Sequence, residues 1–321
     1  MRNIAHVINI GGLVGLSVVI FVFAGAGCFD DAPINYEETI VLQGHIGDSI
    51  GDLGYIRLGS GEAIFTSTFA VGADGSIWIS DPAHGVIKRF TTNGKVIGIV
   101  KCNDMVVDDI AVTDSNRLLV SSWNRAYIDV IDTGGQSIVT CPLPSVPASM
   151  TSVFTSNDAM YASFYEYKGK EYHVVGLQFS PEGELLTRRE DSLQMWVESC
   201  GRYYSRNYNY DNWLSENEIL DGAGNIFVKH PDTGVTNLSA LGVDSDFSLY
   251  VVRTVTAVSP KPTYQVIRYS PNGDKTATFN IRDFETKMAH YAKLDISGNV
   301  YVFACAENAT DWYVYKYSPR K

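Results

Sequence analysis

The chain has 321 residues, with 25 basic and 36 acidic side chains and a net charge of −11. No basic stripe runs along it, and a surface of this sign repels phosphate backbones, so we expect no nucleic-acid partner. Its share of hydrophobic residues, 45%, is ordinary for a globular protein with a sizeable core.

The N-terminus has the pattern of an export signal. Arg2 precedes an apolar stretch from residue 8 to residue 24, and the small residues Gly25-Ala26-Gly27 follow. Cys28, directly after them, resembles the acylated cysteine of a bacterial lipoprotein signal. The resemblance implies a signal over 1–27, a lipidated Cys28 and a location in the cell envelope, facing the periplasm or the exterior. A simple secretory signal and an uncleaved anchor helix are the alternatives, since the apolar stretch is close to the lower limit for a bilayer span. Residues 28–37 are then an acidic tether.

A tight turn followed by a short apolar strand recurs through the rest of the chain. The strands of this pattern are Ile77–Ile79, Leu118–Val120, Met160–Tyr161, Ile226–Val228, Leu249–Val251 and Val300–Val302. A second landmark is an apolar or aromatic residue placed four positions before a turn glycine. Phe90, Ile131, Phe179, His230 and Tyr269 carry it, and Tyr317 matches Tyr269. These landmarks lie 39 to 51 residues apart. Because four-stranded propeller blades repeat at about 40–50 residues, the pattern predicts a six-bladed β-propeller over residues 38–321.

The two ends of the predicted propeller complement each other. The last unit stops without a fourth strand, and Glu38–Gln43 has the apolar pattern of the missing one. We therefore expect the N-terminal strand to complete the final blade and close the ring. In the irregular fourth unit, Ile226–Val228 is interpreted as the third strand and the residues near Trp213 as the second.

Residues 77–95 resemble an NHL-type propeller repeat, in which an apolar strand ends in Asp and a basic-aromatic strand runs into a glycine. Gly47–Gly54 is similar to the glycine-spaced segment that precedes such repeats. The resemblance is good in this one unit and reduces to a bare strand pattern elsewhere. It implies a six-bladed propeller with a binding or scaffolding role, although a few relatives are enzymes.

Four cysteines remain after Cys28, namely Cys102, Cys141, Cys200 and Cys305. An even number in an exported protein allows disulfides, with three possible pairings. Cys102 and Cys141 flank one predicted blade and form the preferred candidate pair; buried free thiols are the alternative. Their spacing fits no zinc site.

The sequence contains no linear catalytic motif, and we predict no catalytic residue, no metal and no cofactor. Asp108-Asp109 is interpreted as a pair of solvated turn carboxylates. Asp244 and Asp246, with Ser245, suggest either a calcium loop or an acidic β-turn before a strand, and the turn is preferred.

Candidate binding residues lie in the loops that follow the repeated strands. Asp81 and His84 follow the first of them, and equivalent positions in the next two units carry Trp123, Asn124, Arg125, Tyr165 and Glu166. Repeat equivalence predicts that these side chains share one face of the ring. The aromatic segment Arg202–Trp213, with Tyr208 and Trp213, is either a second binding surface or a pair of strands.

From these features we expect an exported, membrane-tethered propeller that binds a protein, a peptide or a glycan. The alternatives are a metal-dependent propeller hydrolase or lyase similar to the lactonases, and a structural component of an envelope assembly.

Overall fold

The computed structural model describes residues 34–57, 63–102, 106–122, 124–144, 149–156, 158–168, 171–191, 194–199, 202–207, 217–220, 226–230, 235–255, 263–282, 291–305 and 310–320. All of its strands belong to one compact unit, Pro33–Lys321. The expectations for the signal segment, the tether and Cys28 lie outside the described residues. Within the described part, no helix has the length and apolar character needed to cross a membrane.

Apart from one short hairpin, the described strands form antiparallel four-stranded sheets, and all but the last are built from strands that follow one another along the chain. The first three sheets are β4 (Phe69–Val71) to β7 (Val96–Lys101), β8 (Asp109–Val112) to β11 (Ser137–Pro142), and β12 (Ser149–Ser156) to β15 (Leu185–Asp191). Their middle strands are β5 (Ile77–Asp81), β6 (Val86–Phe90), β9 (Leu118–Ser121), β10 (Tyr127–Ile131), β13 (Ala159–Lys168) and β14 (Glu171–Phe179). A short hairpin, β2 (Ile56–Arg57) with β3 (Ala63–Ile64), precedes them.

The remaining sheets complete a ring. They consist of β16 (Gln194–Ser199), β17 (Arg202–Asn207), β18 (Asn217–Leu220) and β19 (Ile226–His230); β20 (Val235–Val243), β21 (Leu249–Val255), β22 (Thr263–Tyr269) and β23 (Lys275–Ile281); and β24 (Ala292–Leu294), β25 (Val300–Cys305), β26 (Asp311–Pro319) and β1 (Tyr36–His45). The structure describes almost none of the side chains of β16–β19, whereas it describes buried core residues in each of the other five sheets.

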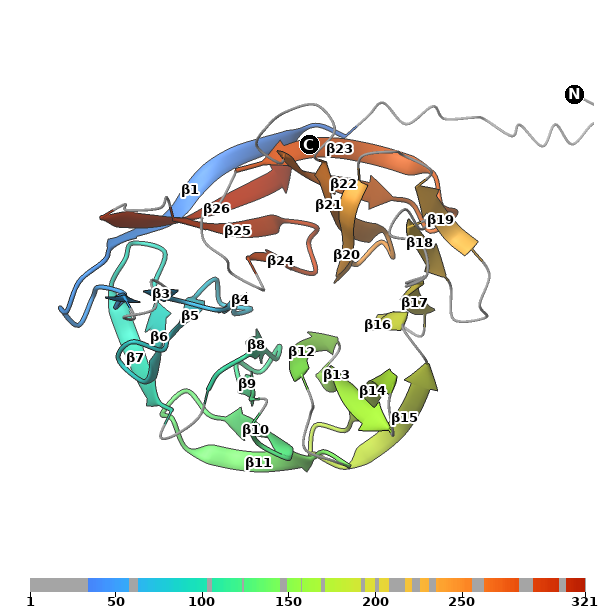
Figure 1. The fold of residues 1–321 in the computed structure, drawn as a ribbon. Coiled ribbons are helices and arrows are strands. Elements are labelled where there is room, and N and C mark those ends of the chain that lie inside the picture. Colours follow the sequence, from blue (N-terminus) through green and yellow to red (C-terminus); the bar gives the residue numbers. More distant parts are fainter. Residues whose placement is uncertain are drawn as a thin grey trace, which may run out of the picture. The chain divides into compact units, whose positions relative to one another are not determined.

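The sheets are arranged as the blades of a β-propeller. The innermost strands β4, β8, β12, β16, β20 and β24 surround the centre of the ring in Figure 1. Contacts run from β4 to β8 and β12, from β13 and β14 to β16, and on through β20 and β24 back to β4. The prediction of an all-β propeller is therefore confirmed, and the repeated apolar strands 77–79, 118–120, 160–161, 249–251 and 300–302 are the second strands of their sheets.

The ring is closed by pairing of the first described strand with the last. β1 runs antiparallel to β26, from Tyr36 opposite Pro319 to His45 opposite Asp311. This pairing confirms the prediction that an N-terminal strand completes the last sheet. The observed strand is longer than the predicted range of residues 38–43. The indole Nε1 of Trp312 donates to the carbonyl oxygen of His45 at 2.9 Å, and Trp312 is fully buried beside Phe303. The closure is thus part of the hydrophobic core.

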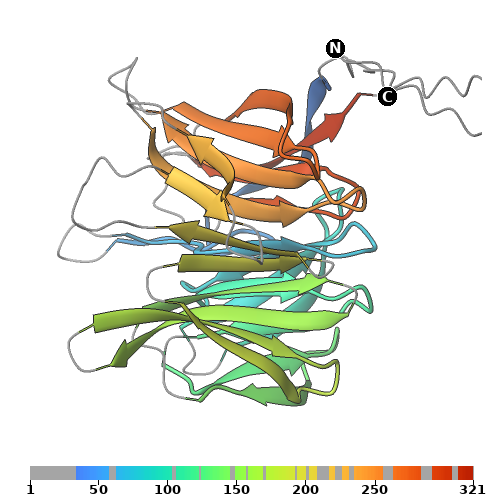
Figure 2. The ribbon, with the colours of Figure 1, turned by 90° about the vertical axis from the view of Figure 1, so that its right-hand side faces the viewer.

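Two faces of the ring follow from the alternation of antiparallel strands, and Figure 2 shows the ring from its side with connections at both ends of the strands. The turn face carries the connections between first and second strands and between third and fourth strands. The loop face carries the connections between second and third strands and those leading to the next sheet. These two names are used below.

The turn-face hairpins explain the glycine landmark of the sequence. Glycines with φ between +83° and +88° stand between third and fourth strands at Gly94, Gly135, Gly183 and Gly273. A residue in the left-handed region at this place completes a hairpin built on a type I turn with a bulge. A Cβ at Gly183 would lie 2.2 Å from Cγ1 of Val139 on the outer strand of the preceding blade. Gly183 is therefore needed both for the conformation of its own turn and for the close approach of the neighbouring blade.

The interpretation of the fourth unit is corrected by the structure. Its second strand is β17 (Arg202–Asn207), and Ile226–Val228 belongs to β19, the fourth strand rather than the third. Gly234, four positions after His230, follows the outermost strand and is therefore not the turn glycine of this unit. Gly222 and Gly224 lie in the segment between β18 and β19, where the repeat places this turn. Trp213 lies outside the described residues.

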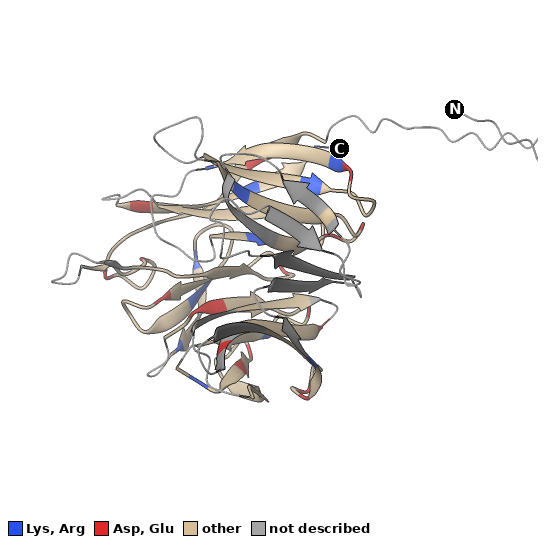
Figure 3. Cartoon of the chain, turned by 45° about the vertical axis from the view of Figure 1, so that its right-hand side comes forward, with Lys and Arg blue, Asp and Glu red and all other residues tan. Residues whose placement is uncertain are grey.

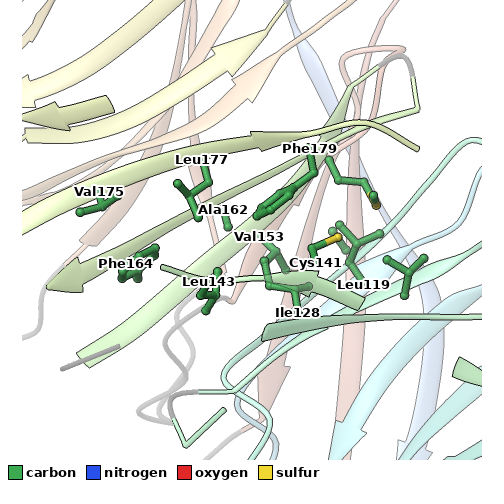
Figure 4. Close-up of a cluster of buried hydrophobic side chains, with 13 residues drawn as sticks. Leu119, Ile128, Cys141, Leu143, Val153, Ala162, Phe164, Val175, Leu177 and Phe179 are labelled. Carbon is green, nitrogen blue, oxygen red and sulfur yellow. The ribbon is translucent and has the colours of Figure 1, made fainter. Parts of the chain in front are cut away.

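The candidate disulfide between Cys102 and Cys141 is also corrected. Both are free, buried thiols and belong to two separate hydrophobic clusters. Cys141 packs among Leu119, Ile128 and Phe179 between the second and third blades (Figure 4). Burial raises the pKa of Cys102 to about 11 and that of Cys141 to about 12. The two thiols therefore act as small apolar core residues. Cys200 lies outside the described residues.

Candidate functional site

Asp81 and His84 lie together at the loop face of the first blade, where β5 ends and a four-residue turn begins. The carboxylate of Asp81 is fully buried, and its Oδ2 is 2.7 Å from Nδ1 of His84. Since an ionised carboxylate only accepts, Nδ1 carries the ring hydrogen and Nε2 is left as the acceptor of the neutral ring. The structure thus brings this predicted pair into direct contact.

The surroundings of Asp81 fix that geometry. Nζ of Lys88 lies 2.8 Å from Asp81 Oδ2, and the backbone N–H of Gly54 donates to Oδ1 at 3.1 Å. Lys88 is itself buried and donates to the carbonyl oxygen of Asp52. Nε2 of His84 faces outward, 3.9 Å from the exposed carboxylate of Asp48. The site can accept a hydrogen bond or a proton from a molecule at the loop face.

Asn124 and Arg125 lie in the equivalent turn of the second blade. Asn124 is exposed, and its Oδ1 accepts a hydrogen bond from the Ser122 hydroxyl. The guanidinium of Arg125 donates to the hydroxyl of Tyr127 at 2.7 Å and lies over the Tyr127 ring. Arg125 is therefore held within its own blade, while its partly exposed position leaves it at the loop face.

Tyr165 and Glu166 lie on β13 in the third blade, close to its loop-face end. Glu166 forms a 3.0 Å ion pair with Arg188 on β15. Tyr165 is opposite Val174 on β14, and its side chain is outside the described ones. Trp123, Tyr208 and Trp213 are outside the described residues. The aromatic segment begins as the strand β17, which supports the strand interpretation for Arg202–Asn207.

Strand direction places the described candidates of three blades on one face, as predicted. Arg125 and Glu166 contact residues of their own blades, whereas Asp81 also accepts a hydrogen bond from Gly54, in the segment that precedes β2. Acidic and basic residues are interspersed along the described strands in the view of Figure 3.

The polar centre of the ring was missed by the sequence interpretation. Asp109 is fully buried at the start of the inner strand β8 and is not a solvated turn residue. Its Oδ1 accepts from the Thr68 hydroxyl at 2.6 Å, and its Oδ2 accepts from the backbone N–H of Val153 at 3.0 Å. One carboxylate therefore joins the inner ends of the first three blades at the loop-face end of the centre.

Lys293 adds the last blade to this centre. Its Nζ donates to Asp109 Oδ1 at 2.8 Å and to the carbonyl oxygen of Ile110 at 3.2 Å. The repeat itself could have indicated this site. The backbone oxygen of Asp109 accepts a hydrogen bond from the Ser121 hydroxyl, and the backbone oxygen of Thr68 accepts the same bond from the Ser80 hydroxyl. Asp109 is therefore equivalent to Thr68 and occupies an inner-strand position.

The carboxylate of Asp244 is held by hydrogen bonds within a β-turn before a strand, which is the preferred interpretation of this acidic segment. Asp244 Oδ1 accepts the backbone N–H groups of Asp246 and Ser248, both at 2.9 Å. Its Oδ2 accepts the Tyr250 hydroxyl at 3.0 Å and the Arg268 guanidinium at 3.2 Å. Burial, together with its hydrogen bond to Tyr36, raises the pKa of Tyr250. Among the described residues, no group of three or more His, Cys, Asp or Glu side chains is arranged to hold a metal ion.

The chain matches no protein-family model and no curated protein sequence. Solved structures share its fold. A member of the DUF4221 family from Bacteroides vulgatus is 11% identical, with a TM-score of 0.53 over 89% of this chain and 99% of that one. Hydrazine synthase from Kuenenia stuttgartiensis is 14% identical, with a TM-score of 0.50 over 74% of this chain and 76% of the other. A gluconolactonase from Xanthomonas campestris is 12% identical, with a TM-score of 0.46 over 79% and 86%. At these identities the first two similarities establish the propeller fold alone, and the third is too low to support an argument.

Proposed function

We propose that this chain is an exported, membrane-tethered propeller that binds a partner protein, peptide or glycan at its loop face. The proposal includes six blades of NHL type, with β16–β19 as the fourth, and acylation of Cys28 after removal of residues 1–27. The signal-like N-terminus supports the export, and the order of the four-stranded sheets supports the blade number.

The observation that carries the binding proposal is the way the loop face presents its polar groups. The turn under His84 is fixed by hydrogen bonds from the N–H of His84 to the carbonyl of Asp81 at 3.1 Å and from Gly85 to Pro82 at 3.2 Å. The N–H of Arg125 is bonded likewise to the carbonyl of Ser122 at 3.2 Å. Preformed loops on a rigid ring lose little conformational entropy when a partner binds.

The test is affinity capture from detergent-solubilised membranes of the source cells, using the full chain and a His84→Ala/Arg125→Ala variant. We expect a partner that the parent chain retains and the double variant loses. Lys95→Ala, on the exposed turn face, is the matched control and should retain the partner. Equal capture by all three chains, or a loss confined to Lys95→Ala, would place binding elsewhere and refute the proposal.

The tether is tested separately by mass spectrometry of the N-terminal peptide of the membrane-extracted chain. Acylation predicts a mature chain that begins at Cys28 with added lipid mass, and Cys28→Ser should appear in the soluble fraction. An unmodified Cys28 in a membrane-bound chain would instead indicate the anchor helix.

A metal-dependent hydrolase or lyase is the second candidate, and the Asp81–His84 pair favours it. A histidine oriented by a buried carboxylate, with its second nitrogen facing outward, is the arrangement of a general base or a metal ligand. Metal analysis of the purified protein after exhaustive dialysis separates the two functions. Stoichiometric calcium or zinc would support the enzyme and direct assays to lactones and esters. A structural envelope component, the third alternative, would instead co-purify in stoichiometric amounts with an envelope complex.

A further inference from the structure

One turn of the propeller departs from the local rules that the others follow. Three non-glycine residues have positive φ, namely Asn116 at 59°, Asp158 at 58° and Phe247 at 61°, and all three stand between first and second strands. Asn and Asp tolerate this left-handed conformation, whereas a bulky aromatic residue rarely adopts it. Phe247 is nevertheless 42% exposed, so core packing does not account for its presence.

The surrounding structure holds Phe247 in this conformation. Its N–H donates to the carbonyl of Asp244 at 3.0 Å, within the turn that the Asp244 carboxylate fixes. The N–H of Ser245 donates to the carbonyl of Ile296 at 2.8 Å, which joins this turn to the equivalent turn of the last blade. Ile296 is 60% exposed. Two neighbouring, hydrogen-bonded turns of the turn face therefore each carry an exposed apolar side chain.

The described chain begins at the same place. The hydroxyl of Tyr36 is 2.9 Å from the hydroxyl of Tyr250, which donates to Asp244. The N–H of Ile34 donates to the carbonyl of Thr276 at 3.2 Å, and the ring of Tyr36 stacks on Phe279. β1 thus starts on the turn face, against the blade that carries Phe247.

The length of the preceding segment limits how far this surface can lie from a membrane anchor. Six residue steps separate Cys28 from Ile34, and an extended chain spans at most about 20 Å over that length. An anchor at Cys28, which belongs to the proposed function, keeps the turn face around Tyr36 within this distance of the bilayer. A short tether also raises the effective concentration of membrane, so a small apolar contact suffices.

We propose that Phe247 and Ile296 form a membrane-docking surface that inserts into the headgroup boundary of the bilayer to which the chain is tethered. Exposed aromatic and aliphatic side chains favour this boundary. The carboxylate of Asp246, next to Phe247, is largely exposed, which disfavours an anionic surface. Lys275 and Arg320 are exposed near the start of β1 and can contact lipid phosphates. The surface therefore fits a zwitterionic phospholipid, and docking turns the loop face away from the membrane.

The test places a tryptophan at the docking surface of the full chain, reconstituted in phosphatidylethanolamine–phosphatidylcholine vesicles with or without brominated acyl chains. Phe247→Trp and Ile296→Trp are measured separately, so that one variant still tests the proposal if the strained turn does not fold with the other. Ile50→Trp is the matched control, since Ile50 is exposed on the loop face. The signal of the parent chain, with its five native tryptophans, is subtracted.

We expect brominated lipid to quench at least half of the added fluorescence at positions 247 and 296 and to leave the control at position 50 unchanged. Replacing half of the lipid by an anionic phospholipid should reduce the quenching. No quenching in either turn-face variant that folds, or equal quenching in all three, would overturn the proposal. Flotation of the vesicles separates the two failures. A chain that floats without quenching refutes the docking alone, and one that does not float refutes the tether and the docking together.

A second measurement asks whether the strain at Phe247 is retained for this purpose. Phe247→Asn introduces the residue found at the equivalent turn of the second blade. We expect a higher melting temperature and, in the Ile296→Trp chain, less quenching by brominated lipid. A lower melting temperature would show that Phe247 serves the fold.

Discussion

The turn face and the loop face of this propeller are built by different rules. On the turn face, hairpins of one type repeat around the described ring, with a left-handed glycine at Gly94, Gly135, Gly183 and Gly273. On the loop face the connections differ from blade to blade in length and composition, and their polar groups are held by bonds specific to each blade. The repeated fold signals are thus concentrated at one end of the strands and the candidate partner-binding residues at the other.

This difference shows what each face can tolerate. The turn face joins neighbouring blades, so its residues are limited by close contacts. The loop face can vary wherever its side chains point outward, with the exception of the buried charges at the ring centre. The predictions below test this division, from the largest expected effect to the smallest.

Lys293→Met should have the largest effect on stability. It removes the ion pair between Lys293 and the fully buried Asp109 carboxylate, and breaking a buried pair costs about 3–5 kcal/mol. Chemical denaturation measures the change. Asp109→Asn in the same chain removes the buried negative charge and should recover part of the loss. Additive effects of the two substitutions would mean that the pair does not hold the loop-face centre together.

Gly183→Ala should cost about 2–4 kcal/mol, from the left-handed backbone and the overlap with Val139. Gly75→Ala is the matched control, because Gly75 has φ +79° and no atom within 4 Å of an added Cβ. It should cost only about 1–2 kcal/mol. Equal melting temperatures for the two variants would contradict the role of the Gly183 turn in joining blades.

His84→Ala should cost only about 1 kcal/mol, since Asp81 keeps Lys88 and the backbone of Gly54. Thermal unfolding and partner capture, measured on the same preparation, should therefore diverge, with binding lost and the fold retained. A loss of stability as large as that of Lys293→Met would make His84 a structural residue instead.

The smallest effect is expected at the ring closure. A hydrogen bond and ion pair with Arg282 hold the pKa of Glu38 below its ordinary value of 4.5. A carboxyl group whose pKa is lowered in the folded state stabilises the fold at pH values above its unfolded pKa. This contribution disappears as the pH falls through the folded pKa. Glu38→Gln should cost under about 1 kcal/mol at pH 7, and the difference should shrink as the pH falls through the folded pKa of Glu38. A variant that remains equally destabilised at acid pH would exclude this linkage.

The sequence was sufficient for most of the fold because the turn-face pattern is local. Phe90, Ile131, Phe179 and Tyr269 end third strands as predicted, and each is followed by the glycine that its hairpin needs. The prediction for the fourth unit was wrong because His230 and Gly234 have the same four-residue spacing but lie at the end of the outermost strand rather than the third. The closing strand was predictable because one strand pattern was missing at one end and present at the other.

The site was predictable only where its partners are close in the chain. Asp81 and His84 are three residues apart, and their contact follows from a single turn. Lys293 and Asp109 are separated by 184 residues, and only the closed ring brings them together. The disulfide prediction failed for the same reason, since spacing along the chain does not show that Cys102 and Cys141 belong to separate clusters.

The pairing of β1 with β26 also sets the order in which this protein can fold. β1 is among the earliest strands to be synthesised, and its partner is the last, so this pairing must close the longest loop in the propeller. Contacts of such large sequence separation form slowly. Until this pairing forms, the last blade exists as a three-stranded sheet with an open edge, and β1 is an unpaired strand. Chaperones that shield extended segments would act most usefully on these two, and a circular permutant that joins β26 directly to β1 should fold faster than the natural chain.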